Sequence, residues 1–226
     1  MSASQAAGAL AGKRVLVSAG PTFEDIDPVR FVGNRSSGKM GFALAAAARA
    51  LGAEVVLVAG PVHLPTPEGV ERIDVRSAAQ MREAVLGALP ADVYVGAAAV
   101  ADFTPRSVSG HKLKKTAGSD TLVLELVRTP DILAEVASHP RRPALVVGFA
   151  AETHDVERYA RGKLAAKQLD LIAANLVGAA EGGFERDDNA LDVYWNGGAR
   201  TLGPAAKTEV AAQLMALVAE RLDGST

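Results

Sequence analysis

The segment Asn34–Gly41, which reads Asn-Arg-Ser-Ser-Gly-Lys-Met-Gly, contains the residue types that bind phosphate. Ser36 and Ser37 offer hydroxyls, Lys39 offers a positive charge, and the glycines let backbone N–H groups approach an anion. A helical pattern follows at once, and a helix N-terminus favours negative charge. Met40 stands where a Walker A loop requires Ser or Thr, so that motif is excluded. The segment predicts a phosphate cradle of another kind; the alternative is an ordinary serine N-cap.

Two further segments contain charges that fit the same chemistry. Gly96–Phe103 places an acid, Asp102, soon after an apolar strand, and Lys112-Leu-Lys-Lys115 concentrates three cations in four residues. A lysine run by itself is usually a solvated surface. In combination, the three segments indicate an enzyme that handles a nucleoside triphosphate.

The composition limits the classes of protein that remain. The 226 residues suit one domain with a substantial core, and 49% hydrophobic with 22% charged residues is typical of a soluble globular domain. A net charge of −2 does not indicate electrostatic binding to nucleic acid or to a membrane surface. The absence of cysteine excludes disulfides and a cysteine nucleophile, and it fits a cytoplasmic protein. No apolar run reaches the roughly 18 residues of a membrane span.

Apolar runs of strand length alternate with helical patterns. Strands are expected at residues 14–19, 54–59, 70–75, 92–96, 144–148 and 169–174, with a half-exposed added strand at 122–127 and an alternating stretch at 190–195. Helices are expected at residues 40–51, 77–89, 156–168 and 207–222, with Ser77 as one N-cap and a short helix opening at Thr129 and Pro130. This alternation predicts an α/β, Rossmann-like parallel sheet with helices on both faces plus an added strand or arm.

Two long segments, 20–39 and 103–119, have no regular pattern, and long loops of this kind are often functional. Ligands of open parallel sheets bind beyond the carboxyl ends of the strands. Ala19, Gly96, Gly148 and Asn175 stand at such ends, so one crevice is expected to gather all the motifs. Residues 1–12 are rich in Ala, Gly and Ser and are expected to be a disordered linker or an added segment, followed by one domain over 13–226.

The order and content of the motifs resemble a known family, the bacterial phosphopantothenoylcysteine synthetases of coenzyme A biosynthesis. The resemblance runs from about Lys13 to Leu222 and rests on Gly20–Thr22, Asp27–Arg30, Asn34–Gly41, Ala98–Asp102, Lys112–Lys115 and Gly148–Thr153. It implies a ligase that uses CTP and Mg²⁺ to join 4′-phosphopantothenate and L-cysteine through an acyl-cytidylate. It also implies a homodimer, and a longer protein in which a flavin-dependent decarboxylase precedes this unit.

The resemblance also assigns candidate site residues. Asn34 and Lys112 are implied to be catalytic, and Asn34, Lys114 and Lys115 to bind the acyl substrate. The implied nucleotide-binding residues are Ser36, Ser37, Gly38, Lys39, Gly96, Ala97, Ala98, Asp102, Lys112, Pro130, Asp131, Ile132, Leu133, Phe149, Lys163 and Lys167. Residue type alone also allows a turn role for Asn34 and a core role for Phe149. Asp102 suits ribose or Mg²⁺ equally, and the direct metal ligands stay open.

Two other classes of protein compete with this one. Tyr159 and Lys163 satisfy the Tyr-x-x-x-Lys pair of short-chain dehydrogenases, which suggests an NAD(P)-dependent oxidoreductase. The turn after the first strand then needs a glycine fingerprint, whereas Pro21 removes an N–H there. A non-enzymatic dinucleotide sensor would have no use for the lysine run. The choice between CTP and ATP stays open, because backbone groups can make that distinction.

Overall fold

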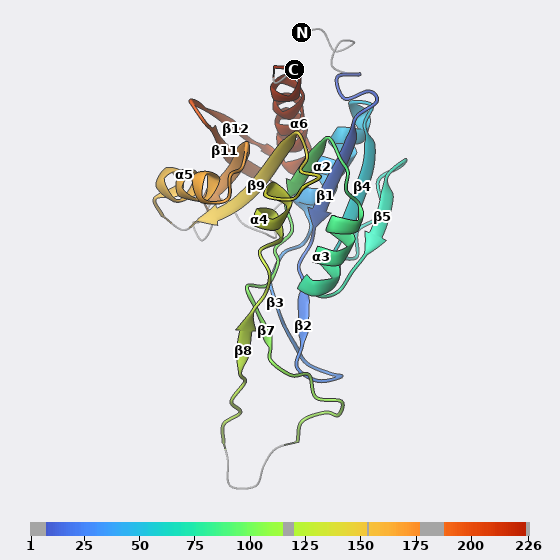
Figure 1. Ribbon diagram of the computed structural model, residues 1–226, viewed down its shortest axis with the longest axis vertical. Helices are drawn as coiled ribbons and strands as arrows, with labels where there is room; N and C mark the ends of the chain where they lie inside the picture. Colours follow the sequence, from blue (N-terminus) through green and yellow to red (C-terminus); the bar gives the residue numbers. More distant parts are fainter. Residues whose placement is uncertain (1–7, 115–119, 153, 177–187, 225–226) are drawn as a thin grey trace.

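The computed structural model describes residues 8–114, 120–152, 154–176 and 188–224. Its centre is an eight-stranded sheet in the order β12-β11-β10-β9-β6-β1-β4-β5 (Figure 1). The strands are β1 (Arg14–Ala19), β4 (Glu54–Ala59), β5 (Glu71–Asp74), β6 (Val93–Gly96), β9 (Leu145–Glu152), β10 (Leu171–Leu176), β11 (Asp188–Trp195) and β12 (Gly198–Ala206). The six from β1 to β10 are parallel, and β11 and β12 add an antiparallel hairpin at one edge.

Side chains that alternate along each strand give the sheet two apolar faces. Val15 and Val17 of β1 point into one cluster of buried side chains, and Leu16 between them points into the other. A strand must be apolar on both sides when helices cover both faces of its sheet. The predicted Rossmann-like α/β class is therefore confirmed.

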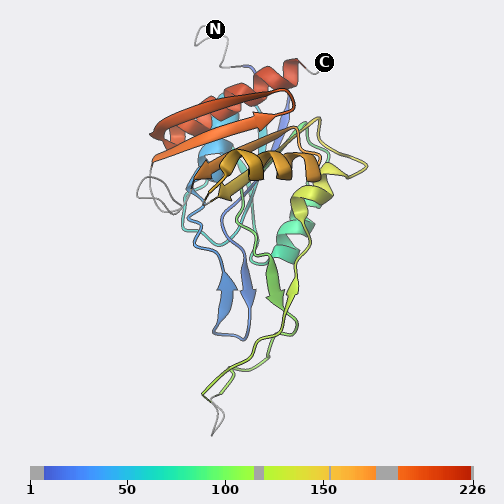
Figure 2. The same cartoon turned by 90° about the vertical axis from the view of Figure 1, so that its left-hand side faces the viewer.

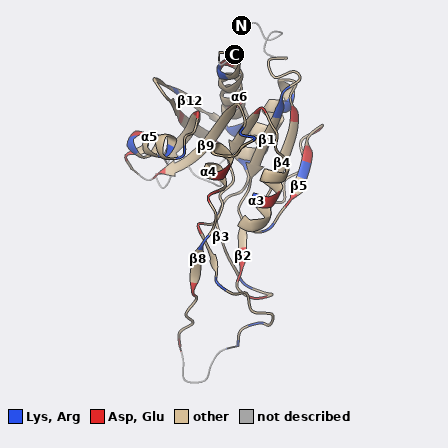
Figure 3. Ribbon diagram, viewed as in Figure 1, with Lys and Arg blue, Asp and Glu red and all other residues tan. Residues whose placement is uncertain are grey.

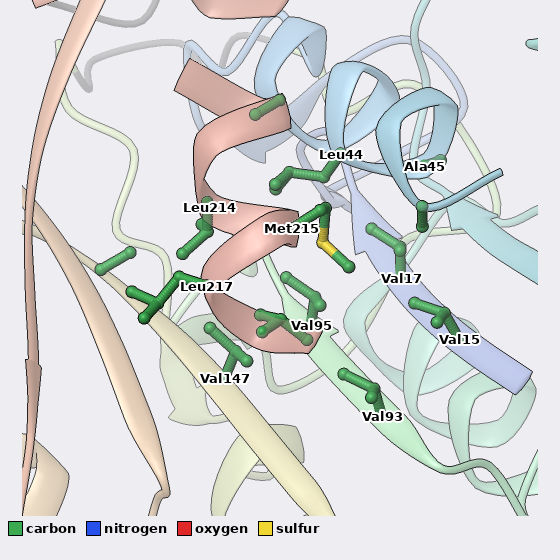
Figure 4. Close-up of a cluster of buried hydrophobic side chains, with 14 of the residues drawn as sticks. Val15, Val17, Leu44, Ala45, Val93, Val95, Val147, Leu214, Met215 and Leu217 are labelled. Carbon is green, nitrogen blue, oxygen red and sulfur yellow. The ribbon is translucent and has the colours of Figure 1, made fainter. Parts of the chain in front are cut away.

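Five helices of the described residues form the outer layers. Helices α2 (Lys39–Ala50) and α6 (Lys207–Asp223) cover one face and pack against each other. Figure 4 shows Leu44 of α2 and Leu214 of α6 above the valines of β1 and β6. Helices α3 (Ala78–Gly87), α4 (Ile132–Ala137) and α5 (Val156–Ala166) cover the opposite face. Ser77 caps α3 in a capping box, as its residue type predicts.

Two short hairpin-like ribbons extend from the sheet and form what we call the arm, residues 20–33 and 103–128 in their described parts. They are β2 (Phe23–Asp25) with β3 (Phe31–Gly33), and β7 (Phe103–Pro105) with β8 (Leu126–Arg128). Figures 1 and 2 show both ribbons running away from the sheet on the same side. These are the segments that lack a sequence pattern, since they pair only over three residues each.

Four elements differ from the prediction. The added strand predicted at 122–127 covers only Leu126 to Arg128. The short helix begins at Ile132 with Asp131 as its N-cap, because the Thr129 hydroxyl donates to Ala101 O at 2.6 Å and the Asp131 carboxylate accepts from Ala134 N. Strand β12 was not predicted, and β9 continues past Gly148 to Glu152.

The structure describes only residues 8–12 of the predicted N-terminal linker, residues 1–12. Residues 1–7 lie outside the described residues, so the linker stays a prediction there. Leu10 is fully buried, and its N–H donates to Leu51 O at 2.9 Å, which ties this part of the chain to the end of α2. Among the described helices, none has both the length and the apolar character needed to cross a membrane.

Candidate functional site

A cavity of about 750 Å³ opens at the carboxyl edge of the sheet, where the parallel strands end. It gathers most of the residues that the sequence singles out: Asn34, Ser36, Ser37, Gly38, Lys39, Gly96, Ala97, Ala98, Asp102, Pro130, Asp131, Ile132, Leu133, Phe149 and Lys167. These residues come from five separate parts of the chain. The predicted common crevice is therefore present.

The segment predicted to be a phosphate cradle lies where the chain turns into α2. Gly38 is the N-cap with φ 75°, a left-handed conformation that suits glycine, and the helix begins at Lys39. Gly41 lets α2 lie against β1, since a Cβ there would come within 2.4 Å of the Ala19 Cβ. The glycines thus place the first N–H groups of α2 at the end of β1. Ser36, Ser37 and Lys39 line the cavity beside them.

Asn34 is held against the loop that follows β6. Its side-chain Nδ2 donates to Ala99 O at 2.9 Å. An amide group has two N–H donors, so one remains for a ligand. The same loop is fixed from both sides, because Ala99 N donates to Gly20 O and Ala101 N donates to the Thr22 hydroxyl, both at 2.9 Å. This network gives Asn34 a defined position at the cavity wall.

The second wall carries the first residues of α4 and Lys167, which follows α5. Lys167 follows α5 and lines the cavity, and its Nζ lies 2.8 Å from Asp131 Oδ2. Lys163 does not line the cavity; its Nζ lies 2.6 Å from Glu152 Oε1. Each lysine has a carboxylate partner contributed by a different element.

The described lysines of the run, Lys112 and Lys114, do not line the cavity. Lys112 and Lys114 are exposed on the arm and are absent from its described lining, and Lys115 lies outside the described residues. Leu113 between them is anchored: its N–H donates to Asp27 Oδ2 at 3.1 Å, and its carbonyl accepts from Arg30 Nη2 at 3.0 Å. The Arg30 guanidinium, with backbone N–H donors, holds the pKa of Asp27 well below its usual range.

Several polar residues of the lining had no site role in the sequence prediction. Ser18 Oγ and Tyr94 Oη form a buried hydrogen bond of 3.0 Å beside the cavity, and burial raises the pKa of Tyr94 to about 12. Asn175, Asn189 and Lys207 complete the wall on the β10, β11 and α6 side. For Asn175, its position at the end of a predicted strand already indicated that it lies at the crevice. For Lys207, the sequence predicted only that the last helix begins there.

The dehydrogenase alternative has no support. The Tyr159 hydroxyl contacts Arg158 and His154, Lys163 is paired with Glu152, and neither Tyr159 nor Lys163 lines the cavity.

In the part of the chain that the structure describes, no three His, Cys, Asp or Glu side chains are grouped to hold a metal. Figure 3 shows Lys and Arg interspersed with Asp and Glu along the ribbon.

A Rossmann-like sheet with a cavity at its carboxyl edge, lined by serine, glycine and lysine residues at a helix start, is typical of α/β domains that bind phosphorylated ligands. Residues 10–222 match the family model described as the DNA/pantothenate metabolism flavoprotein C-terminal domain. The chain belongs to this family.

Named relatives agree with this assignment. The coenzyme A biosynthesis bifunctional protein CoaBC of Vibrio cholerae is 52% identical over 94% of this chain, and that of Bacillus subtilis is 50% identical over 96%. The chain spans about half the length of these relatives, 54% and 53%. A crystal structure of the C-terminal domain of CoaBC is 41% identical, with a TM-score of 0.81, and the match covers 96% of this chain and 99% of that one. A Cab2 mutant in complex with phosphopantothenate-cysteine has the same fold, with a TM-score of 0.75 at 17% identity.

Proposed function

We propose that this chain is the ligase unit of coenzyme A biosynthesis that joins 4′-phosphopantothenate and L-cysteine at the expense of CTP. The observation that carries the proposal is the single cavity in which Asn34, the cradle at the start of α2 and Lys167 meet. Its size lies in the upper part of the range of roughly 300–1,000 Å³ for ligand sites, so it suits more than one small ligand. The relatives named above are coenzyme A biosynthesis proteins.

The proposed reaction has two steps. A carboxylate oxygen of phosphopantothenate attacks the α-phosphorus of CTP, and the bond to the β-phosphate oxygen breaks to release pyrophosphate. The amine of cysteine then attacks the acyl carbon of the acyl-cytidylate, CMP leaves, and the nitrogen loses a proton. Neither step needs a protein nucleophile. The protein must align two anionic reactants and neutralise their charge, and fixed donors in a cavity do this without reorganising.

Each wall of the cavity has a part in this scheme. The free N–H of Asn34 is placed to donate to the acyl oxygen, while the other N–H keeps the side chain on Ala99 O. Lys167 faces the triphosphate and leaves Asp131 when the nucleotide enters. Lys163 stands one helical turn earlier and is proposed to leave Glu152 to bind the nucleotide. Lys112 is proposed to reach the triphosphate from the arm.

The cavity fits a Mg²⁺ ion that arrives with the nucleotide. Protein Mg²⁺ sites commonly use one or two carboxylates together with substrate phosphates. Asp102 is an exposed carboxylate in the lining and would hold the ion. The ion would neutralise the triphosphate and the leaving pyrophosphate.

The test is a pyrophosphate-release assay with CTP, phosphopantothenate, cysteine and MgCl₂. We expect release with phosphopantothenate and CTP before cysteine is consumed, and none in EDTA. ATP in place of CTP serves as the matched control and should support little turnover. Equal turnover with ATP would contradict the nucleotide assignment, and turnover in EDTA would contradict the role of the metal.

We also propose that the chain acts as a homodimer within a longer protein that carries a flavin-dependent decarboxylase. The support for the dimer is the arm, where Val29, Phe31, Phe103, Val108 and Val123 are exposed by 44–88%. Apolar side chains gathered in this way usually mark a binding surface. The support for the longer protein is the length of the bifunctional relatives.

A further inference from the structure

Helix α4 forms part of one wall of the cavity, and contacts outside the cavity hold it there. Its N-cap Asp131 and its first residues, Ile132 and Leu133, line the cavity. The helix has only six residues, and an isolated helix of fewer than about 12 residues is marginal in water. Packing against other elements must therefore set the position of α4.

On the side of the sheet, Leu133 packs into a notch made by two glycines. Gly96 of β6 and Gly148 of β9 are register partners, so they lie side by side in the sheet. A Cβ at Gly96 would lie 3.2 Å from Leu133 Cδ1, and a Cβ at Gly148 would lie 2.9 Å from Leu133 Cδ2. The missing side chains let α4 lie close against the sheet, which fixes its depth.

Beside α4, a charged pair ties it to the neighbouring helix α3. The Arg82 guanidinium of α3 donates to both carboxylate oxygens of Glu135, from Nε to Oε2 at 2.6 Å and from Nη2 to Oε1. A bidentate pair of this kind fixes direction as well as distance. Arg82 holds the pKa of Glu135 below its usual range, so the pair stays charged at neutral pH.

Helix α3 is a firm support for this pair. Met81 and Val85, on its inner face, are fully buried. The buried carboxylate of Glu24, in β2 of the arm, accepts from Ala78 N at the start of α3, at 2.8 Å. Because α3 is anchored at its start and along its inner face, Arg82 has a defined position from which to hold α4.

Holding Glu135 also holds the start of α4, one turn earlier. Glu135 N donates to Asp131 O at 3.0 Å, and the Asp131 carboxylate accepts from Ala134 N at 3.1 Å. The other carboxylate oxygen of Asp131 lies 2.8 Å from Lys167 Nζ. The first turn of α4 thus joins the ion pair outside the cavity to the wall that carries Lys167.

We propose that Arg82 is a positioning residue for nucleotide binding, which acts through Glu135 on the first turn of α4. The proposal rests on the proposed function, in which the wall of α4 and Lys167 faces the triphosphate. Neither Arg82 nor Glu135 lines the cavity, so the pair acts only through α4. It places Asp131 and Leu133 before the nucleotide enters, and a preorganised wall lowers the cost of binding.

The test measures kcat and the KM values for CTP and phosphopantothenate in Arg82→Gln and in Glu135→Gln. Each variant should raise the KM for CTP about three- to tenfold, as expected for charged hydrogen bonds at a partly exposed site. The kcat and the KM for phosphopantothenate should change little, because a raised KM at constant kcat is the sign of lost ground-state binding.

Exchange of the two charges separates this role from a general effect of substitution. Arg82→Glu alone puts two carboxylates together and should raise the KM for CTP most. The double variant Arg82→Glu with Glu135→Arg restores an ion pair and should bring the KM back toward the wild-type value.

Arg200→Gln is the matched control. Arg200 Nη1 lies 3.0 Å from Glu220 Oε2, and this pair joins β12 to α6. Its side chains are 46% and 37% exposed, against 41% and 33% for Arg82 and Glu135, and neither lines the cavity. The control should leave the KM for CTP unchanged.

The outcomes distinguish this proposal from the proposed function. An unchanged KM for CTP in Arg82→Gln and Glu135→Gln would overturn the positioning role while the function stands. An equal rise for phosphopantothenate, or the same rise in Arg200→Gln, would also overturn it. If the wild type turns nothing over, calorimetry with CTP decides: weaker binding by Arg82→Gln would support the pair and contradict the proposed reaction, and a wild type that binds no CTP would contradict both.

Discussion

At the scale of single residues, the side-chain amide of Asn34 can have two roles, one in supporting a turn and one in binding a ligand. It donates to Ala99 O at 2.9 Å, which is the turn-supporting role that its residue type suggests, and it keeps a second donor for a ligand. The structural and the catalytic interpretations of this residue are therefore compatible.

We expect Asn34→Asp to slow formation of the acyl-cytidylate more than it weakens CTP binding. A carboxylate cannot donate to the acyl oxygen, and it repels both the attacking carboxylate and the phosphate. Loss of one such donor typically costs about a hundredfold to a thousandfold in rate. Rapid-quench measurement of the intermediate, combined with a CTP titration, separates the two effects. Normal formation of the intermediate would show that Asn34 only supports the turn.

At the scale of elements, Asp27 ties the β2–β3 ribbon to the segment that carries Lys112. Its carboxylate accepts from Val29 N, Arg30 N, the Arg30 guanidinium and Leu113 N at distances of 2.5–3.1 Å. Asp27 is the only described residue that accepts bonds from both of these segments of the arm through one side chain. The position of the lysine run depends on it.

We expect Asp27→Asn to lower the unfolding temperature at pH 7. Arg30 lowers the pKa of Asp27 in the folded state, so its contribution is fully present above the unfolded pKa of about 4 and is lost as pH falls below that value. The difference between variant and wild type should therefore shrink between about pH 4 and pH 2. Asp74→Asn, which removes an exposed partner of Arg72, is the control and should have a smaller effect. Equal stability of Asp27→Asn and wild type at pH 7 would contradict this account.

At the scale of the whole molecule, the arm exposes apolar side chains far from the core. Val123 is 88% exposed and Phe31 45%, while the sheet buries its own apolar residues on both faces. In Figure 2 the arm stands clear of the helices, so the described part of this chain does not cover it. We propose that a second copy of the chain packs against the exposed apolar side chains of the arm.

We expect the chain to sediment as a dimer and Phe31→Asp to shift it toward the monomer, since a charge in an apolar interface is costly. Analytical ultracentrifugation over a range of concentrations measures this. Tyr159→Asp is the matched control, because Tyr159 is also an exposed aromatic residue but lies on α5. A monomeric wild type, or a dimer that survives Phe31→Asp, would count against the arm as the interface.

The sequence by itself determined the elements whose signals are local. Strands β1 and β4 match the predicted residues 14–19 and 54–59 because an apolar run between turns is a complete signal for a buried strand. Ser77 marks the start of α3 for an equally local reason, a side-chain cap. The motifs around Asn34, Gly96 and Asp131 were also visible, and the carboxyl-edge rule for parallel sheets placed them in one crevice.

Only the tertiary structure decided which distant groups share that crevice. Lys207 follows a strand that the sequence did not reveal, and two reversals of direction bring it to the edge where α2 begins. Thr129 lost its predicted capping role because Ala101, 28 residues away, accepts its hydroxyl. Lys163 and Lys167 gained carboxylate partners from β9 and from the start of α4. These outcomes depend on which strands become neighbours, and strand order is fixed by the burial of both sheet faces rather than by any local pattern.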